Sequence, residues 1–248
     1  MYSYPQRSLG VPRRAPSVAL PFLRRVYLLF TGGVWFAVIG AIVALYAGAP
    51  LEVTTRGGAV AHVPPLVGFA MQHWFLMMLG YFAAFFAASF MRHIRGLNIA
   101  ALFGYAFVTG IFIAPSVFVA QAMASGGHTL DPSPVRDAFL LTAAAFVGLS
   151  GYTLVTRKDF SNLGAALSIG LFVLIGATLL GFFVHAAVFH LAVASVGVLL
   201  FAGYILYDTS RIMREGEGDA VGAALRLFLD IVNLFLLLLR ILSSSRDR

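Results

Sequence analysis

The sequence contains seven long apolar runs, each about the length of a membrane-spanning helix. They are approximately residues 26–46, 66–90, 98–120, 137–155, 163–184, 189–207 and 223–242. A helix that crosses the hydrocarbon core of a bilayer needs about 20 mainly apolar residues. Only 11% of the 248 residues are charged, against about 25% in a soluble domain. The runs therefore predict an all-α integral membrane protein, a bundle of seven transmembrane helices.

The seven runs leave too few residues for a second, soluble domain. Residues 1–25 hold five arginines and several prolines, and we expect them to form a basic, mostly disordered cytoplasmic arm. Residues 26–242 form the predicted transmembrane domain, and residues 243–248 a short polar tail. The first run has the length of a span and continues into a polar loop, which favours a transmembrane helix over a cleaved signal peptide.

Cysteine and charge usage exclude several classes of protein. The chain has no cysteine, which excludes disulfide bonds, thiolate metal sites and cysteine nucleophiles. A formal charge of +7 would suggest a nucleic-acid partner for a soluble protein. Here the basic residues lie at the ends of apolar runs, where they act as topology signals facing anionic lipid headgroups. We therefore expect a lipid bilayer as the partner, and no nucleic acid.

Lysine and arginine counts predict the orientation of the bundle. With the N-terminus in the cytoplasm, the inner segments hold eleven basic residues and the outer segments four. Basic residues favour the cytoplasmic side, so we expect a cytoplasmic N-terminus, in a membrane such as the bacterial inner membrane. The basic C-terminal tail is the exception, and it leaves open a re-entrant last helix.

A polar stripe runs along the last apolar run. Arg226, Asp230, Asn233, Leu237 and Arg240 recur at steps of four and three residues, so they share one face of a helix. Lipid cannot satisfy such a stripe, which must face protein or water. We therefore expect the seventh helix to be central in the bundle, with Asn233 and Arg240 in a polar stripe that lines a pore.

Two aspartates on the last two runs lie at similar depth. By helix rise, Asp208 and Asp230 are about 6 and 10 Å from the cytoplasmic boundary. Facing carboxylates in a partly dry site do not both ionise readily, so we expect the pair to share a proton and act as a pH sensor. When ionised, the pair offers the oxygen ligands that Ca²⁺ prefers. The alternative is two independent ion pairs, Asp230 with Arg226 and Asp208 with Arg211 or Arg92.

A Gly-x-Ser-Gly sequence at residues 148–151 resembles the nucleophile motif of rhomboid proteases. Its serine, Ser150, would need His185 or His190 as a base. In the predicted topology both histidines lie about 20 Å away by helix rise, which no hydrogen bond crosses. The chain also has no zinc-ligand spacing and no nucleotide-binding loop. We therefore expect no enzyme activity and no cofactor.

Four segments of the sequence resemble the Bax inhibitor-1 family, also called the transmembrane Bax inhibitor motif family. The most specific are Tyr-Asp-Thr at residues 207–209 and LFLDIVNLFLLLLR at residues 227–240. Residues 104–115 and 151–161 also agree with the family pattern. The resemblance covers approximately residues 26–242 and is to bacterial-type members. One departure is Phe228, which stands where a tyrosine is usual.

The resemblance implies a passive, pH-sensitive Ca²⁺ leak through a seven-helix bundle. The family's gating aspartates fall on Asp208 and Asp230, and a basic partner for the second aspartate falls on Arg92. Bacterial relatives are also known as modulators of a membrane protease. The alternative function is therefore a membrane-embedded regulator that binds a membrane protease or a cell-death partner without conducting ions.

Overall fold

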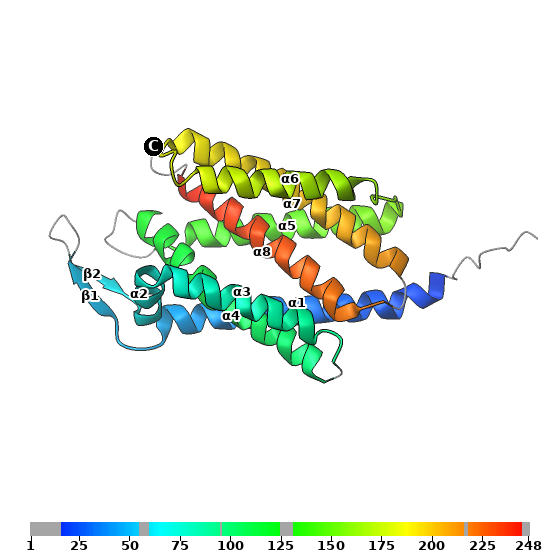
Figure 1. Cartoon of the computed structure of the whole chain (residues 1–248), viewed down its shortest axis with the longest axis horizontal. Helices are drawn as coiled ribbons and strands as arrows, with labels where there is room; N and C mark the ends of the chain where they lie inside the picture. The colour runs from blue at the N-terminus through cyan, green and yellow to red at the C-terminus, as the bar shows by residue number, and fades with distance from the viewer. Residues whose placement is uncertain (1–15, 55–59, 95, 125–130, 216–217, 245–248) are drawn as a thin grey trace, which may run out of the picture.

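The computed structural model describes residues 16–54, 60–94, 96–124, 131–215 and 218–244, and these residues are mostly helical (Figure 1). The helices are α1 (Pro16–Tyr46), α2 (Pro65–Gln72), α3 (Trp74–Met91), α4 (Leu97–Ala124), α5 (Ser133–Thr156), α6 (Leu163–Leu180), α7 (Ala187–Glu215) and α8 (Ala220–Ser244). Two short strands, β1 (Leu51–Thr54) and β2 (Val60–Val63), precede α2.

Six helices of the described chain are long and apolar enough to cross a membrane, namely α1 and α3 to α7. The prediction of a helical, multi-pass membrane protein is therefore confirmed. Helix α8 is 25 residues long but is not among the six. It carries Arg226, Asp230 and Arg240 along its length. The seventh span stays a prediction.

Helix α1 begins at Pro16, ten residues before the first predicted helix. Residues 16–25 are therefore helical, where the sequence predicted a disordered arm. A proline in the first turn of a helix sacrifices no hydrogen bond, because the first N–H groups have no partner within the helix. Phe22 and Val26 are buried in the main apolar cluster and hold this extension against the bundle. Residues 1–15 of the predicted arm lie outside the described residues.

The second predicted run is divided into two helices. Helix α2 ends and α3 begins at His73, whose backbone angles (φ −116°, ψ 42°) are not helical. The loop predicted before this run contains the β1–β2 hairpin, in which Leu51 pairs with Val63 and Thr54 with Val60. The valines and the threonine of these strands favour extended backbone. The hairpin lies at the opposite end of the molecule from the start of α1 (Figure 1).

Helices α1 and α4 cross at two glycines. A methyl group built on Gly40 would overlap the carbonyl oxygen of Phe107, and one built on Gly110 would overlap that of Ala37. Small residues at a crossing let two helix backbones approach closely in a membrane, where van der Waals packing drives helix association. These glycines therefore set the spacing of α1 and α4.

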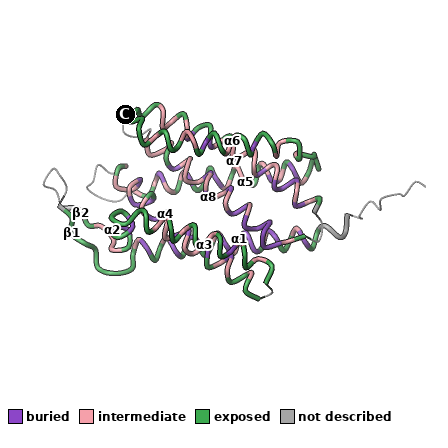
Figure 2. The backbone as a smooth tube through the Cα atoms, viewed as in Figure 1, coloured by how far each residue is buried: buried purple, intermediate pink, exposed green. Residues whose placement is uncertain are grey.

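Helix α8 packs against α1, α4, α5 and α7. It runs diagonally across the molecule between the α5–α7 group and the α1–α4 group (Figure 1). Figure 2 shows buried residues concentrated along the first half of α8 and on the helix faces around it. Helices α3 and α6 are mostly exposed and carry apolar side chains such as Phe82, Phe86, Phe172 and Val173, as expected for faces that contact lipid.

Candidate functional site

The side chains of Asp208 on α7 and Asp230 on α8 lie side by side in the bundle. Their residues are only 4% and 6% exposed, and the two carboxyl groups are within hydrogen-bonding distance of each other. The structure thus brings together the two aspartates that the sequence placed at similar depth. Buried carboxyl groups are rare unless they are paired. The pair is therefore the strongest candidate for a functional site.

Neighbouring contacts fix the position of Asp208. Thr209 lies against α5, where its Oγ1 atom is 3.2 Å from the Oγ atom of Ser150. Ser210 accepts a hydrogen bond from the backbone N–H of Phe160 (3.3 Å). The residues directly after Asp208 are thus tied to α5 and to the α5–α6 connection. This orientation turns Asp208 towards α8.

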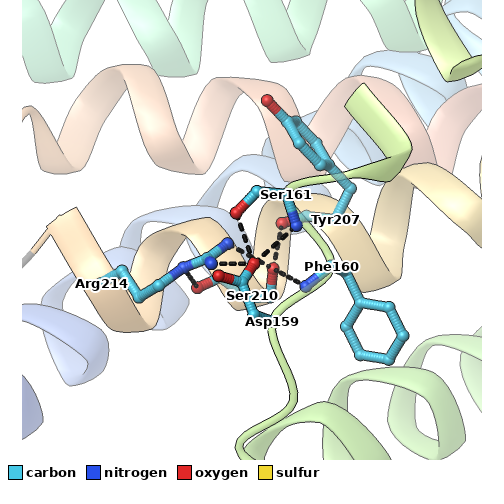
Figure 3. Close-up of polar contacts among 6 residues, drawn as sticks. All are labelled: Asp159, Phe160, Ser161, Tyr207, Ser210 and Arg214. Carbon is cyan, nitrogen blue, oxygen red and sulfur yellow. Dashed lines mark hydrogen bonds and ion pairs between the residues drawn. The ribbon is translucent and has the colours of Figure 1, made fainter. Parts of the chain in front are cut away.

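Figure 3 shows how the α5–α6 connection, residues 157–162, is attached to the end of α7. Arg214 forms an ion pair with Asp159. Its Nη2 atom also donates a hydrogen bond to the Oγ atom of Ser210 (3.1 Å), and that hydroxyl donates to the carbonyl oxygen of Tyr207 (3.0 Å). This cluster could not be predicted from the sequence, because the pairing of Asp159 with Arg214 depends on how α7 packs.

Arg226 is a basic residue that reaches the aspartate pair. Its Nε atom is 3.4 Å from the Oδ1 atom of Asp208, on the neighbouring helix. Its positive charge also acts on Asp230, one turn further along α8. In the predicted alternative, Arg226 pairs with Asp230, four residues away on the same helix. In the structure, its Nε atom instead forms an ion pair with Asp208 on α7. The second carboxylate oxygen of Asp230, Oδ2, is buried and has no hydrogen-bond partner in the described chain.

Arg92 pairs with a carboxylate other than the one expected. Its Nε atom is 3.6 Å from the Oδ2 atom of Asp219, eleven residues before Asp230 and about 16 Å away by helix rise. Asp219 accepts a hydrogen bond from the N–H of Gly222 (2.9 Å) and so caps the start of α8. Arg92 follows the last residue of α3, and α8 presents Asp219 to it there. An aspartate directly before an apolar helix is a capping signal that the sequence contained.

The part of the predicted polar stripe that follows Asp230 is less buried than Asp230 itself. Asn233 donates a hydrogen bond from Nδ2 to the carbonyl oxygen of Leu229 (2.8 Å), so part of its amide is used within α8. Arg240 is exposed and borders a cavity of about 500 Å³ between α4 and α8, which is also lined by Pro115 and Leu237. A pore-lining role for Asn233 and Arg240 stays a prediction.

The histidines expected at the far end of the bundle do not approach Ser150. That serine contacts Thr209 near the end of α7, whereas His190 lies in the first turn of the same helix. Nineteen residues of helix separate Thr209 from His190, which corresponds to about 28 Å. A serine–histidine pair for nucleophilic catalysis therefore does not form with His190.

The described residues contain no cluster of three or more histidine, aspartate or glutamate side chains that could hold a metal ion. Asp208 and Asp230 provide at most four carboxylate oxygens, whereas a resident Ca²⁺ takes six to eight oxygen ligands. The pair is thus better suited to brief contact with a passing cation than to a permanent metal site.

Comparisons with known proteins give a consistent result. The family model described as inhibitor of apoptosis-promoting Bax1 matches residues 20–247. Protein lifeguard 4 of Mus musculus is 33% identical over 232 residues, which cover 93% of this chain and 88% of that protein. An uncharacterized protein of Campylobacter jejuni is 33% identical over 92% of this chain and 90% of its own length. The Golgi anti-apoptotic protein of Vaccinia virus (strain Lister) is 38% identical over 69% of this chain and 68% of its own.

Proposed function

The chain belongs to the Bax inhibitor-1 family, and from this premise we propose that it is a passive, pH-sensitive Ca²⁺ leak channel. The observation that carries the proposal is the buried contact between Asp208 and Asp230, in which one oxygen of Asp230 has no hydrogen-bond partner among the described residues. A buried acidic pair at a helix interface is costly. Its presence in a multi-pass membrane protein is best explained by ion or proton binding.

The proposed gate is the contact between α7 and α8. When Asp208 and Asp230 share one proton, they hydrogen-bond and hold the two helices together. When both are ionised, their repulsion must be relieved by a cation, by Arg226 or by separation of the helices. We propose that α8 is the central, seventh transmembrane helix. Because α8 packs against four other helices, a shift at this contact would change the whole bundle.

The proposed topology places the N-terminus in the cytoplasm, in a membrane such as the bacterial inner membrane. The start of α1, the ends of α3, α5 and α7, and the start of α8 lie at one end of the molecule (Figure 1). Basic residues gather at these helix ends, and in the described chain they are Arg24, Arg25, Arg92, Arg157, Lys158, Arg211 and Arg214. This distribution is typical of a cytoplasmic side, and in the proposed topology the gate lies in the cytoplasmic half.

A second candidate function is a regulator that binds a partner protein without conducting ions. It is favoured by the relatives in Vaccinia virus strains, which are named Golgi anti-apoptotic protein. Deletion of residues 2–15, which stops before α1 begins at Pro16, separates the two functions. A pore formed by the helices should keep its Ca²⁺ flux after this deletion, whereas binding through the arm should be lost.

The gate is tested by neutralising the aspartates in purified, reconstituted protein. Ca²⁺ flux is measured in liposomes between pH 5 and 8 for Asp208→Asn, Asp230→Asn and the double variant. Each single variant should flatten the pH dependence, and the double variant should add little, because the two groups act as one titrating unit. Asp137→Asn is the control, since Asp137 pairs with its neighbour Arg136 on α5. Wild-type pH profiles in both single variants would refute the sensor.

A further inference from the structure

Three charged side chains meet between α7 and α8, where the sequence pattern emphasised two. The Nε atom of Arg226 is 3.4 Å from the Oδ1 atom of Asp208, and their side chains are 28% and 5% exposed. Asp208 in turn contacts Asp230. Arg226 is thus a member of the same buried cluster, close to both carboxylates and shielded from most of the solvent.

The charges and polar groups around Asp230 come from several helices. The charges that act on Asp230 in the described chain are those of Asp208 and Arg226. Helix α7 also presents the phenol of Tyr204, and α4 presents Tyr105, whose hydroxyl donates a hydrogen bond to that of Tyr81 (2.7 Å). Arg92 and Asp219 neutralise each other at the start of α8.

Two further neighbours of α8 contribute hydroxyl groups near this depth. Helix α1 contributes the buried hydroxyl of Tyr27. Helix α5 contributes the hydroxyls of Ser150 and Thr153, which bond to Thr209 and to the backbone of α5. Two carboxylates and one guanidinium therefore make up the charge of the cluster itself, and Arg211, three residues after Asp208 on α7, is a further basic residue one turn away.

We propose that Arg226 determines the ion selectivity of the aspartate pair by cancelling the charge of one carboxylate. With both aspartates ionised, the cluster then presents one net negative charge instead of two. This inference rests on the proposed channel function and deepens it. It assigns to Arg226 the role of a selectivity residue, which weakens the binding of divalent cations and so lets them leave the site.

The physical basis is that the energy between a fixed charge and an ion is proportional to the charge of the ion. A guanidinium beside the site therefore repels Ca²⁺ twice as strongly as it repels Na⁺. If Arg226 lowers the affinity for Na⁺ by some factor, it lowers the affinity for Ca²⁺ by the square of that factor. Conduction requires that an ion bind well enough to enter and weakly enough to leave. Two uncompensated buried carboxylates would hold Ca²⁺ too long.

A series of variants changes the net charge of the cluster in single steps. With both aspartates ionised, Asp208→Asn leaves zero, wild type leaves minus one and Arg226→Gln leaves minus two. Arg226→Lys and the double variant Asp208→Asn with Arg226→Gln both return it to minus one. Arg214→Gln is the matched control, because it removes a basic residue that pairs with the exposed Asp159 at the same end of α7.

Two measurements at pH 8 test the series. The first is the Ca²⁺/Na⁺ permeability ratio from reversal potentials in planar bilayers, and the second is Ca²⁺ binding to the detergent-solubilised protein by titration calorimetry. We expect Arg226→Gln to raise the ratio at least tenfold and to tighten Ca²⁺ binding. A ratio near wild type is expected for Arg226→Lys, for the double variant and for Arg214→Gln, and a lower ratio for Asp208→Asn.

The outcomes separate this inference from the proposed function. If wild type conducts and the ratio does not follow net charge across the series, the selectivity role of Arg226 is wrong. If wild type conducts no cation at all, the channel function fails, and calorimetry alone decides whether Arg226 weakens Ca²⁺ binding. If Arg226→Gln does not fold, the comparison of Asp208→Asn with the double variant still tests the charge dependence.

Discussion

The crossing of α1 and α4 gives the sharpest prediction about stability. In Gly110→Ala, the new methyl group overlaps the carbonyl oxygen of Ala37 and lies 2.7 Å from the backbone nitrogen of Ala41. Ordinary contacts between such atoms are about 3.5–4.0 Å, so the helices must separate by roughly 1 Å. Because the atoms it meets are backbone, no side-chain rotation can relieve the overlap.

The expected loss of stability can be taken from the effect of overpacking in protein interiors. Extra methyl groups in well-packed sites cost about 1–3 kcal/mol, occasionally more, and a backbone clash belongs at the upper end. Gly104→Ala is the matched control on the same helix, because a methyl group there meets nothing within 4 Å. Both variants gain the same helix propensity, up to about 1 kcal/mol, which cancels in the comparison. The two variants should therefore differ by about 3 kcal/mol in the free energy of unfolding.

The assay is thermal unfolding in detergent, followed by the fraction of monodisperse protein that remains after heating. For a chain of 150–250 residues, about 1 kcal/mol corresponds to roughly 2–4 °C in Tm. Gly110→Ala should thus unfold about 6–12 °C below Gly104→Ala. Equal Tm values would refute the close packing of α1 and α4.

The remaining predictions concern the ion pair at the start of α8, the serine motif and the topology. Arg92→Gln should lower Tm by only a few degrees, because the half-exposed ion pair with Asp219 contributes about 0–1 kcal/mol. The same variant should leave the pH profile of Ca²⁺ flux unchanged. A changed profile would support pairing of Arg92 with Asp230. Ser150→Ala should keep the flux of wild type, and a serine-reactive fluorophosphonate should not label the protein. A reporter fused after Lys158 should be cytoplasmic and one near His128 outside; the reverse result would invert the topology.

The helices were predictable because the length of an apolar run is a local property of the sequence. Every predicted run corresponds to helical structure, although the second is divided into two helices at His73. A single non-helical residue within an apolar run gives no compositional signal. The extension of α1 to Pro16 was also not predictable from the sequence. The arginines and prolines of this segment are typical of disorder, whereas the packing of Phe22 that stabilises the helix is a tertiary contact.

The meeting of Asp208 and Asp230 was predictable from two local facts. A short connection between the last two helices fixes the relative depth of the residues on either side, and the polar stripe fixes which face of α8 turns inward. The partners of the arginines were not predictable in the same way. Arg226 has one aspartate a turn away on its own helix and another on α7, and only the packing of α7 on α8 places its Nε atom beside Asp208.

The pairing of Arg92 illustrates the limit of a family resemblance. The resemblance implied a contact with Asp230, because the family's basic residue at the end of the second helix falls on Arg92. In the structure Arg92, directly after α3, lies beside the start of α8, where Asp219 is the carboxylate within reach of its side chain. Depth along a helix can be counted from the sequence, whereas the offset between two helices that are not consecutive in the chain cannot.

Whether the chain is a channel is decided most directly by Ca²⁺ flux into liposomes that contain only this protein. Uptake is followed with an enclosed Ca²⁺ indicator after a Ca²⁺ gradient is imposed at a series of pH values. We expect flux down the gradient at a rate that changes with pH, without an energy source or a partner protein. Absence of flux at every pH, from protein shown to be folded and correctly inserted, would contradict the channel function and leave the regulator.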